Sequence, residues 1–356
     1  MCVAYRDAYP SSMISGSLPI GVLLIQLGTP NSTKVSDVRA YLREFLSDPR
    51  VLDMPAPARA LLLNAVILPF RPRRSAEQYE KIWTELGSPL LIHTEELSRQ
   101  VQRALGDGFR VAFGMRYQRP PITEAVERLV EAGCDRLVIL PLFPQYASAS
   151  TGSALEEALR VIGERRNVPD VVTIGAFYTE PGFIRAVAHV AKPHLDGFQP
   201  DHVLLSYHGL PEKQVRRSDA TGEWCLSAET CCDRIFDGNR FCYRAQCFAT
   251  SRALAAELQL SPGSFSTTFQ SRLAGQKWIE PYTDVEITKL HQSGVRRLAV
   301  LTPSFTADCL ETLEEIGIRL RAQWAGVGGE ELLVVPCVNS ETAWVAAVVD
   351  MILEAA

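Results

Sequence analysis

The sequence lacks the features that mark several common classes of protein. No run of apolar residues reaches the roughly 18 residues of a membrane-spanning helix, and residues 1–17 lack the apolar core of a secretory signal peptide. Acidic residues slightly outnumber basic ones, 41 to 36, so no basic excess points to nucleic-acid binding. We therefore expect a cytoplasmic protein, and its 356 residues are enough for two domains.

Glycine-rich functional motifs are missing as well. The chain contains neither G-x-G-x-x-G nor G-x-x-x-x-G-K-[ST], which weakens a dinucleotide-binding or P-loop interpretation. It also lacks G-x-S-x-G, so a hydrolase triad would have no nucleophile elbow to carry its serine.

The pattern that is present is an alternation of strands and helices. We expect strands at 21–27, 109–115, 136–142, 171–177, 202–208, 264–269, 296–302 and 331–335. Helix-like segments lie between most of them, at 35–47, 97–105, 122–131, 154–162, 183–190, 249–258, 284–292 and 310–323. Such alternation predicts βαβ units and an α/β fold with parallel sheets. We divide the chain into a leader (1–17), two halves (18–180 and 181–340) and an apolar last helix (341–356) that packs back across the halves.

Residues 54–70 form an unusual apolar segment, followed directly by Arg71, Arg73 and Arg74. It is too short to cross a bilayer. An apolar helix with a basic flank can lie on a membrane surface or form the lip of an apolar pocket. An ordinary buried helix is the alternative, and the sequence leaves both open.

The stretch Leu204-Leu-Ser-Tyr-His208-Gly-Leu-Pro211 predicts a buried strand that ends at a histidine. Ligands of open α/β sheets bind at the carboxyl ends of the strands, and an imidazole there can move protons near neutral pH. A histidine that only packs in the core is the alternative.

A row of acidic residues follows the strand at 296–302. On a helix, Asp308, Glu311 and Glu315 would share one face. Three carboxylates on one face suit the path of a divalent cation. The other interpretation is a solvated acidic helix, since the helix dipole favours acidic residues in the first turn.

Five of the nine cysteines lie within residues 225–247: Cys225, Cys231, Cys232, Cys242 and Cys247. In a reducing compartment, such clustering indicates metal binding more often than disulfides. Thiolate clusters suit Zn²⁺ or an iron–sulfur cluster, and the spacing is not that of a zinc ribbon, which would show two C-x2-C knuckles.

Taken together, these motifs resemble the ferrochelatase family, whose members insert Fe²⁺ into a porphyrin. The resemblance rests on blocks that span residues 20 to about 340 in family order: Leu24-Ile-Gln-Leu-Gly-Thr-Pro30, Gly87-Ser-Pro-Leu90, Gly114-Met-Arg-Tyr117, Phe143-Pro-Gln-Tyr-Ala-Ser-Ala-Ser-Thr-Gly-Ser153, Ser206-Tyr-His-Gly-Leu-Pro211, Phe269-Gln-Ser-Arg272, Lys277-Trp-Ile-Glu-Pro281 and Phe305-Thr-Ala-Asp-Cys-Leu-Glu-Thr-Leu-Glu-Glu-Ile316.

The resemblance implies the chelatase fold, two similar Rossmann-like (flavodoxin-like) domains with four-stranded parallel sheets and a porphyrin cleft between them. It implies His208 and Glu311 as catalytic residues, and a metal path of His208, Glu311, Asp308 and Glu315. It also implies the porphyrin-binding residues Leu27, Arg116, Tyr117 and Trp278, and it matches residues 54–70 to the lip that admits porphyrin.

Family members often carry a [2Fe–2S] cluster, and the resemblance implies one in the insertion at 219–248. Its expected ligands are Cys225, Cys231, Cys232 and Cys242. Cys247 could replace one of the adjacent pair, and a segment without metal is the third alternative. Cys309 departs from members that have histidine there; it is either a metal contact or a packed thiol.

The expected function is therefore that of a lyase that inserts Fe²⁺ into protoporphyrin IX and releases two protons. The alternatives are a chelatase for coproporphyrin III or another tetrapyrrole, and a non-enzymatic iron–sulfur or haem sensor built on this fold. The expected partners are the porphyrin and ferrous iron, with peripheral membrane contact through 54–70; the protein is expected to be a monomer or homodimer and to bind no nucleic acid.

Overall fold

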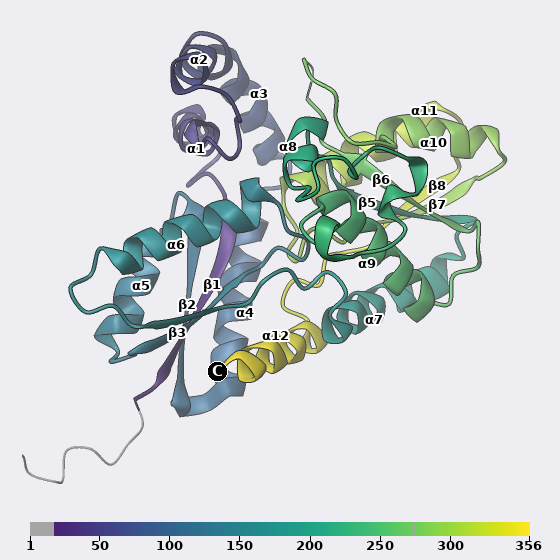
Figure 1. The fold of residues 1–356 in the computed structure, drawn as a ribbon. Helices are drawn as coiled ribbons and strands as arrows, with labels where there is room; N and C mark the ends of the chain where they lie inside the picture. Colours follow the sequence, from purple (N-terminus) through teal and green to yellow (C-terminus); the bar gives the residue numbers. More distant parts are fainter. Residues whose placement is uncertain (1–17, 274) are drawn as a thin grey trace, which may run out of the picture.

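A computed structural model describes residues 18–273 and 275–356, so the leader expected at 1–17 lies outside the described residues. Within them, eight strands form two separate four-stranded parallel sheets (Figure 1). The strands are β1 (Ile20–Gly28), β2 (Phe109–Tyr117), β3 (Arg136–Pro141), β4 (Asp170–Thr173), β5 (His202–His208), β6 (Phe265–Gln270), β7 (Arg297–Leu301) and β8 (Glu331–Val334). The expected α/β class with two parallel sheets is confirmed.

The two sheets have the same topology. Their strand orders are β2-β1-β3-β4 and β6-β5-β7-β8, with every pairing parallel. The central strands are apolar because helices cover both faces of the sheet; Val22, Leu204 and Val300 are completely buried. In each sheet the second strand in sequence lies on one side of the first strand and the third lies on the other side. The order of the strands therefore switches between β1 and β3 in one sheet and between β5 and β7 in the other. Ligands bind at such switch points.

Helices flank the sheets and add a projecting group. They are α1 (Val35–Ser47), α2 (Ala56–Leu61), α3 (Leu68–Glu80), α4 (Pro89–Leu105), α5 (Ile122–Glu131), α6 (Ser153–Gly163), α7 (Pro181–Phe198), α8 (Glu212–Arg217), α9 (Tyr243–Glu257), α10 (Thr283–Gln292), α11 (Arg321–Gly326) and α12 (Thr342–Ala355), with π-helical η1 (Leu62–Ile67), η3 (Ser148–Gly152) and η6 (Glu311–Leu320). Figure 1 shows α1, α2 and α3 standing together beyond the first sheet.

Several boundaries differ from the expected ones. α4 and α7 begin earlier, at Pro89 and Pro181, because proline is favoured in the first turn of a helix. β4 ends at Thr173 instead of 177, because only residues 170–173 pair with β3. The expected helix at 310–323 is instead the π-helix η6 followed by α11.

The last helix, α12, contacts α7 and α4 and so packs against helices of both sheets (Figure 1). Its Trp344 is fully buried and packs against the rings of Phe177 and Phe183 at 5.7 Å. One continuous apolar core includes Trp344 together with residues of both sheets. No helix in residues 18–273 and 275–356 has the length and apolar character needed to cross a bilayer.

Candidate active site

His208 is the last residue of β5, at the switch point of the second sheet. Its backbone N–H donates to Oγ of Ser304, 3.0 Å away, in the loop after β7. The buried Tyr243 hydroxyl donates to the His208 carbonyl at 2.8 Å. Hydrogen bonds from two segments therefore fix the backbone of this half-buried histidine.

The tautomer of His208 follows from one contact. Its Nδ1 lies 2.6 Å from the carbonyl oxygen of Gly209. Because a carbonyl can only accept, Nδ1 carries the hydrogen, and the neutral ring presents a lone pair at Nε2. The centroid of the imidazole ring lies 6.5 Å from the ring centroid of Trp278 and 6.3 Å from that of Phe305. A lone pair beside aromatic walls can accept a proton or bind a metal.

Glu311 and Glu315 lie on η6. The wide turn of a π-helix, with i→i+5 hydrogen bonds, brings residues four apart close to one face. The N–H of Ser271 donates to Oε1 of Glu315 at 2.8 Å, and its hydroxyl donates to Oε2. Burial raises the pKa of Glu315 and outweighs the Ser271 hydrogen bonds, and the charges of Glu311 and His208 also act on it. The two carboxylates and the imidazole are therefore electrostatically linked.

Asp308 corrects the expectation of three carboxylates on one helix face. It precedes η6, is 8% exposed, and its Oδ2 accepts from Nδ2 of Asn339 at 2.8 Å. Its Oδ1 accepts from the Thr312 hydroxyl at 2.9 Å. The loop after β7 is also held by Thr306, whose hydroxyl donates to the Leu142 carbonyl at 3.1 Å. These contacts keep the chain non-helical before Leu310, so Asp308 fixes the start of η6.

Cys309 is a buried thiol packed against Leu90 and Ala307. Burial raises its pKa well above the ordinary range, and the charge of Glu311 adds to the rise. Near neutral pH this cysteine is therefore a neutral thiol, which favours the packing interpretation over a metal contact.

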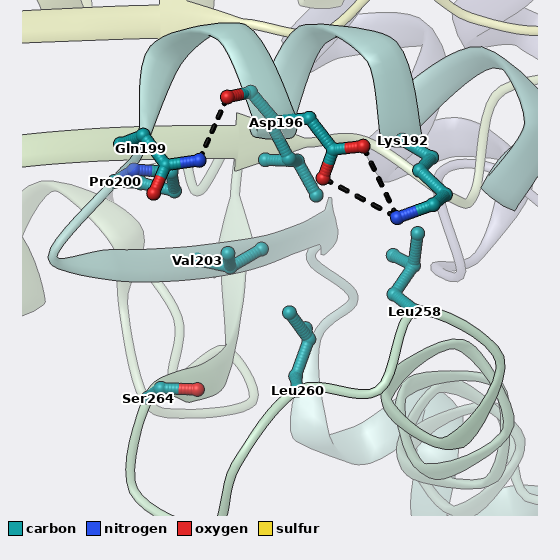
Figure 2. Close-up of a pocket in the computed structure, with 9 residues that line it drawn as sticks. Lys192, Asp196, Gln199, Pro200, Val203, Leu258, Leu260 and Ser264 are labelled. Atoms are coloured by element: carbon teal, nitrogen blue, oxygen red, sulfur yellow. Dashed lines mark hydrogen bonds and ion pairs between the residues drawn. The ribbon is translucent and has the colours of Figure 1, made fainter.

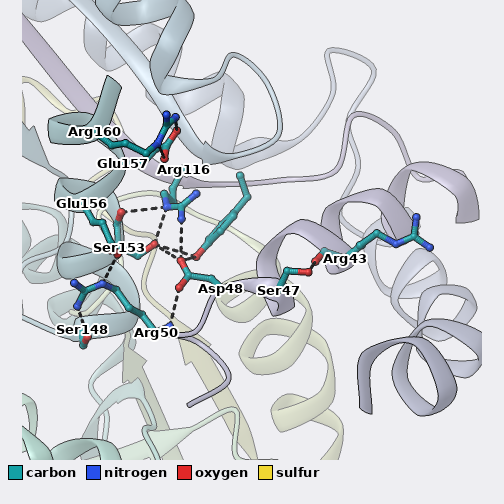
Figure 3. Close-up of polar contacts among 11 residues, drawn as sticks. Arg43, Ser47, Asp48, Arg50, Arg116, Ser148, Ser153, Glu156, Glu157 and Arg160 are labelled. Atoms are coloured by element: carbon teal, nitrogen blue, oxygen red, sulfur yellow. Dashed lines mark hydrogen bonds and ion pairs between the residues drawn. The ribbon is translucent and has the colours of Figure 1, made fainter. Parts of the chain in front are cut away.

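A polar network centred on Asp48, after α1, holds the carboxyl end of β2 (Figure 3). Asp48 accepts hydrogen bonds from Nη2 of Arg116 at 2.9 Å, the hydroxyl of Tyr117 at 2.8 Å, the hydroxyl of Ser153 and the N–H of Arg50 at 2.7 Å. Burial alone would raise the pKa of Asp48, but these donors and the Arg116 charge outweigh it, so the pKa lies below its ordinary value.

This network brings together two of the expected porphyrin residues and two that the sequence analysis missed. Arg116 and Tyr117 were expected, whereas Asp48 and Ser153 were not. The signal for Asp48 was an acidic residue directly after an amphipathic helix, but its side-chain partners lie 68 and more positions away in the chain.

Trp278 and Leu27, the other two expected porphyrin residues, belong to different parts of the fold. Trp278 follows β6 and is 6% exposed; among the residues that the structure describes, its indole N–H has no hydrogen-bond partner. Leu27, near the end of β1, is half-buried beside an aromatic cluster formed by Tyr41 and Phe45 of α1 and Tyr79 of α3. Gly28 ends β1 at φ +117°, where a Cβ would lie 2.0 Å from the carbonyl oxygen of Tyr117, so this approach of β1 to β2 requires glycine.

The apolar segment 54–70 resolves into α2, η1 and the first turn of α3. Leu61, Val66 and Phe70 are 69%, 54% and 76% exposed. Leu63 and Leu68 are the residues that anchor it to the aromatic cluster. The segment therefore presents an exposed apolar surface, and the alternative of an ordinary buried helix is wrong.

The cysteine insertion is compact. Cys225, Cys231, Cys232 and Cys242 are each at most 3% exposed, and every cysteine that the structure describes is a free thiol. The Asp219 carboxylate accepts from the N–H of Trp224 at 2.8 Å and of Cys225 at 2.7 Å. The Trp224 indole N–H donates to the Cys231 carbonyl at 2.9 Å.

The four sulfurs are arranged as two pairs. Sγ of Cys225 lies 3.7 Å from Sγ of Cys242, and Sγ of Cys231 lies 3.6 Å from Sγ of Cys232. Tetrahedral metal–sulfur bonds of about 2.3 Å hold two ligand sulfurs about 3.8 Å apart. Cys247 is fully buried, and burial raises the pKa of its thiol well above the ordinary range. Across 18–273 and 275–356, no three His, Cys, Asp or Glu side chains converge to hold one ion.

Two surface pockets lie away from these residues. The pocket in Figure 2, of about 170 Å³, is lined by Lys192, Asp196, Val203 and Leu260 and lies at the opposite end of β5 from His208. A larger one of about 490 Å³ lies between β4 and the end of α12. Neither contains an expected site residue.

Comparison with known proteins links the whole described chain to one family. The family model "Ferrochelatase" matches residues 19–356. A ferrochelatase of Coxiella burnetii (strain CbuK_Q154) is 47% identical over 332 residues, covering 93% of this chain and 92% of that protein. A ferrochelatase of Legionella pneumophila (strain Lens) is 47% identical over 335 residues, covering 94% and 98%.

A solved structure supports the fold alone. It is a multi-domain protein of Deinococcus radiodurans with structural similarity to chelatases, at 14% identity and a TM-score of 0.50. The alignment covers 96% of this chain and 56% of that one.

Proposed function

The chain belongs to the ferrochelatase family of lyases, and we propose that it inserts Fe²⁺ into protoporphyrin IX at a site formed by His208 and Glu311. The observation that carries this assignment is the hydrogen bond from Nδ1 of His208 to the Gly209 carbonyl, which leaves Nε2 as a proton acceptor. The acceptor lies at the switch point of the second sheet, near the carboxylates of η6.

Metal insertion requires the loss of two pyrrole protons. We assign their acceptance, one at a time, to Nε2 of His208, which is unprotonated in the neutral tautomer and can act as a general base. Because Nε2 holds a single proton, it must release the first to solvent before it takes the second. The aromatic neighbours Trp278 and Phe305 would lie against the macrocycle. A ring held bent exposes its nitrogen lone pairs and lowers the barrier to metal entry.

Glu311 and Glu315 are the proposed contacts for the incoming iron. Carboxylate oxygens bind divalent cations, and a Glu315 whose pKa is raised by burial can exchange a proton as the cation arrives or leaves. Asp308 takes a supporting part in this path, because its oxygens already accept hydrogen bonds from Asn339 and Thr312.

Leu27, Arg116, Tyr117 and Trp278 are the proposed porphyrin-binding residues. Arg116 and Tyr117 would act as a wall fixed by Asp48, since Tyr117 is fully buried and the Arg116 side chain is 18% exposed. We propose that the halves divide near residue 180 and bind the macrocycle between them, with α12 joining them.

We also propose that the insertion at 219–248 holds a [2Fe–2S] cluster through Cys225, Cys231, Cys232 and Cys242. The sulfur separations of 3.7 and 3.6 Å match those of two thiolates bound to one metal ion, as each iron of such a cluster requires. When bound, the group would supply folding free energy to the insertion. Substituting Cys225→Ser should bleach the visible absorption of the purified protein; a colourless, zinc-containing wild type would contradict the cluster.

The exposed lip of Leu61, Val66 and Phe70 supports a peripheral contact with a membrane surface, from which an apolar porphyrin would enter. We therefore propose a cytoplasmic location with such contact. Replacing all three with serine should abolish co-sedimentation with anionic lipid vesicles, and unchanged co-sedimentation would contradict the proposal.

The substrate is tested by anaerobic incubation of the protein with Fe²⁺ and either protoporphyrin IX or coproporphyrin III, with the porphyrin spectrum as readout. We expect protoporphyrin to be consumed with the higher kcat/KM. A preference for coproporphyrin III would mean that this porphyrin is the substrate, and consumption of neither porphyrin would refute the enzyme assignment.

A further inference from the structure

Three consecutive residues at the start of α9 connect the cysteine insertion with the active site. Cys242 belongs to one of the two sulfur pairs. Tyr243 donates a hydrogen bond to the carbonyl of His208 at 2.8 Å. Arg244 extends from the same turn toward a second cysteine and toward the segment that carries Trp278.

The Arg244 guanidinium bridges two groups that are far apart in sequence. Its Nη1 donates to Sγ of Cys232 at 3.1 Å, and its Nε donates to the carbonyl oxygen of Glu280 at 3.1 Å. The guanidinium also lies over the ring of Phe248, 4.7 Å from its centroid. The guanidinium carries its donors on separate nitrogens in fixed directions, so Nη1 and Nε can hold two partners that lie apart, whereas a lysine ammonium has all its donors on one atom.

The Glu280 carbonyl belongs to the segment that holds Trp278. Trp278 forms an isolated bridge with Pro211, and the N–H of Ile279 donates to the Leu210 carbonyl at 3.0 Å. These contacts join the Trp278 segment to the residues directly after His208. A hydrogen bond at Glu280 therefore restrains the peptide that sets the position of the indole.

We propose that Arg244 is a positioning residue that ties the Cys232 sulfur to the Trp278 segment, so that the state of the cysteine site affects porphyrin binding. The proposal rests on the proposed function, in which Trp278 contacts the porphyrin and Cys232 holds metal. A metal-bound thiolate accepts a charge-assisted hydrogen bond, which is stronger than one to a neutral thiol. Arg244 is therefore held most firmly when the cysteines are loaded.

The test is Arg244→Gln in the metal-loaded protein, with two independent readouts. We expect the KM for porphyrin to rise about tenfold, the effect of losing a charge-assisted hydrogen bond, while kcat stays within about twofold. We also expect the reduction potential of the iron–sulfur group to become more negative, because hydrogen bonds to the ligand sulfurs set that potential.

Arg252→Gln is the matched control. Arg252 lies on the same helix and its Nη1 donates to the backbone carbonyl of Cys232 at 3.3 Å, with no sulfur or Glu280 contact recorded among the described residues. We expect neither readout to move. If Arg244→Gln fails to load metal, Arg244→Lys keeps a positive charge at the sulfur but cannot span both partners, so its KM should still rise.

Each result decides the proposal. A KM that rises without a change in potential would mean that the cysteine sulfur takes no part. A potential that shifts with an unchanged KM would mean that the contact does not reach Trp278. Either outcome overturns the proposed link. A wild-type protein that inserts no iron would instead refute the proposed function, and the potential would still report the Arg244–sulfur contact.

Discussion

Glu314 provides a quantitative test of the contact between α3 and η6. Its side chain is 1% exposed. The carboxylate pairs with Nζ of Lys81 at 3.3 Å and Nε of Arg319 at 2.7 Å, and it accepts from Nε2 of Gln78 at 3.4 Å. Lys81 and Gln78 come from the α3 region and Glu314 from η6, so the substitution Glu314→Gln removes a charge that joins the two elements.

The magnitude follows from the exposure of the partners. Removing one member of a fully buried ion pair costs about 3–5 kcal/mol. Here Lys81 and Arg319 are each 49% exposed and can be rehydrated. We discount the cost for this solvent screening, to about 2 kcal/mol.

Urea unfolding measures the effect as a lower midpoint at an unchanged slope. Glu286→Gln is the control, because Glu286 and Lys289 form an ion pair at 3.0 Å on the surface of α10; it should cost less than about 0.5 kcal/mol. If Glu314→Gln were as stable as the wild type, the cost of burying the carboxylate would equal its pairing energy, and our estimate would be wrong.

Three further substitutions test the site. Asp48→Asn should lower the free energy of unfolding by about 2 kcal/mol near pH 7, because Arg116 loses its buried partner. Since folding lowers the pKa of Asp48, the difference from wild type should shrink as pH falls below about 4. A difference that does not depend on pH would contradict this explanation. Glu315→Gln should stabilise the protein at neutral pH, because burial raises the pKa of Glu315 and so makes its ionised form unfavourable in the folded state. The gain in stability should develop as pH rises above about 4.3 and be absent below it. Urea unfolding from pH 4 to 8 measures it. Cys309→Ala should keep steady-state iron insertion within about threefold of wild type, since its thiol is neutral, and lose about 1 kcal/mol of stability through the small cavity; a hundredfold loss of activity would restore its assignment as a metal contact.

The fold was largely readable from the sequence because its signals are local. Between His202 and His208 the run is apolar except for Ser206, and Gly209 follows it; the strand ends where this pattern predicts. The helices at 35–47 and 122–131 have strong apolar periodicity and also match their expected bounds.

The misassigned and missed residues depend on distant partners. Asp308 was expected on a helix because its i, i+3 and i+7 spacing to Glu311 and Glu315 places all three on one face only if the helix extends back to Asp308. Its hydrogen bond to Asn339, 31 positions away, holds it outside η6 instead. Asp48 was missed for the same reason, since Arg116, Tyr117 and Ser153 meet it only through the folded sheet.

Two questions that the sequence left open needed three-dimensional information. Apolar composition alone could not show whether residues 54–70 are buried, because that depends on what covers them; the exposure of Leu61 and Phe70 answers it. Cysteine spacing along the chain likewise does not give the pairing of sulfurs in space, which the 3.7 and 3.6 Å separations supply.

The most direct test of the central claim is the rate of anaerobic Fe²⁺ insertion by His208→Ala, measured alongside porphyrin binding by fluorescence. If Nε2 of His208 accepts the pyrrole protons, kcat should fall by about a hundredfold or more while the porphyrin Kd changes little. A variant that inserts iron within about threefold of the wild-type rate would show that another group takes the protons, and the assignment of this site would be wrong.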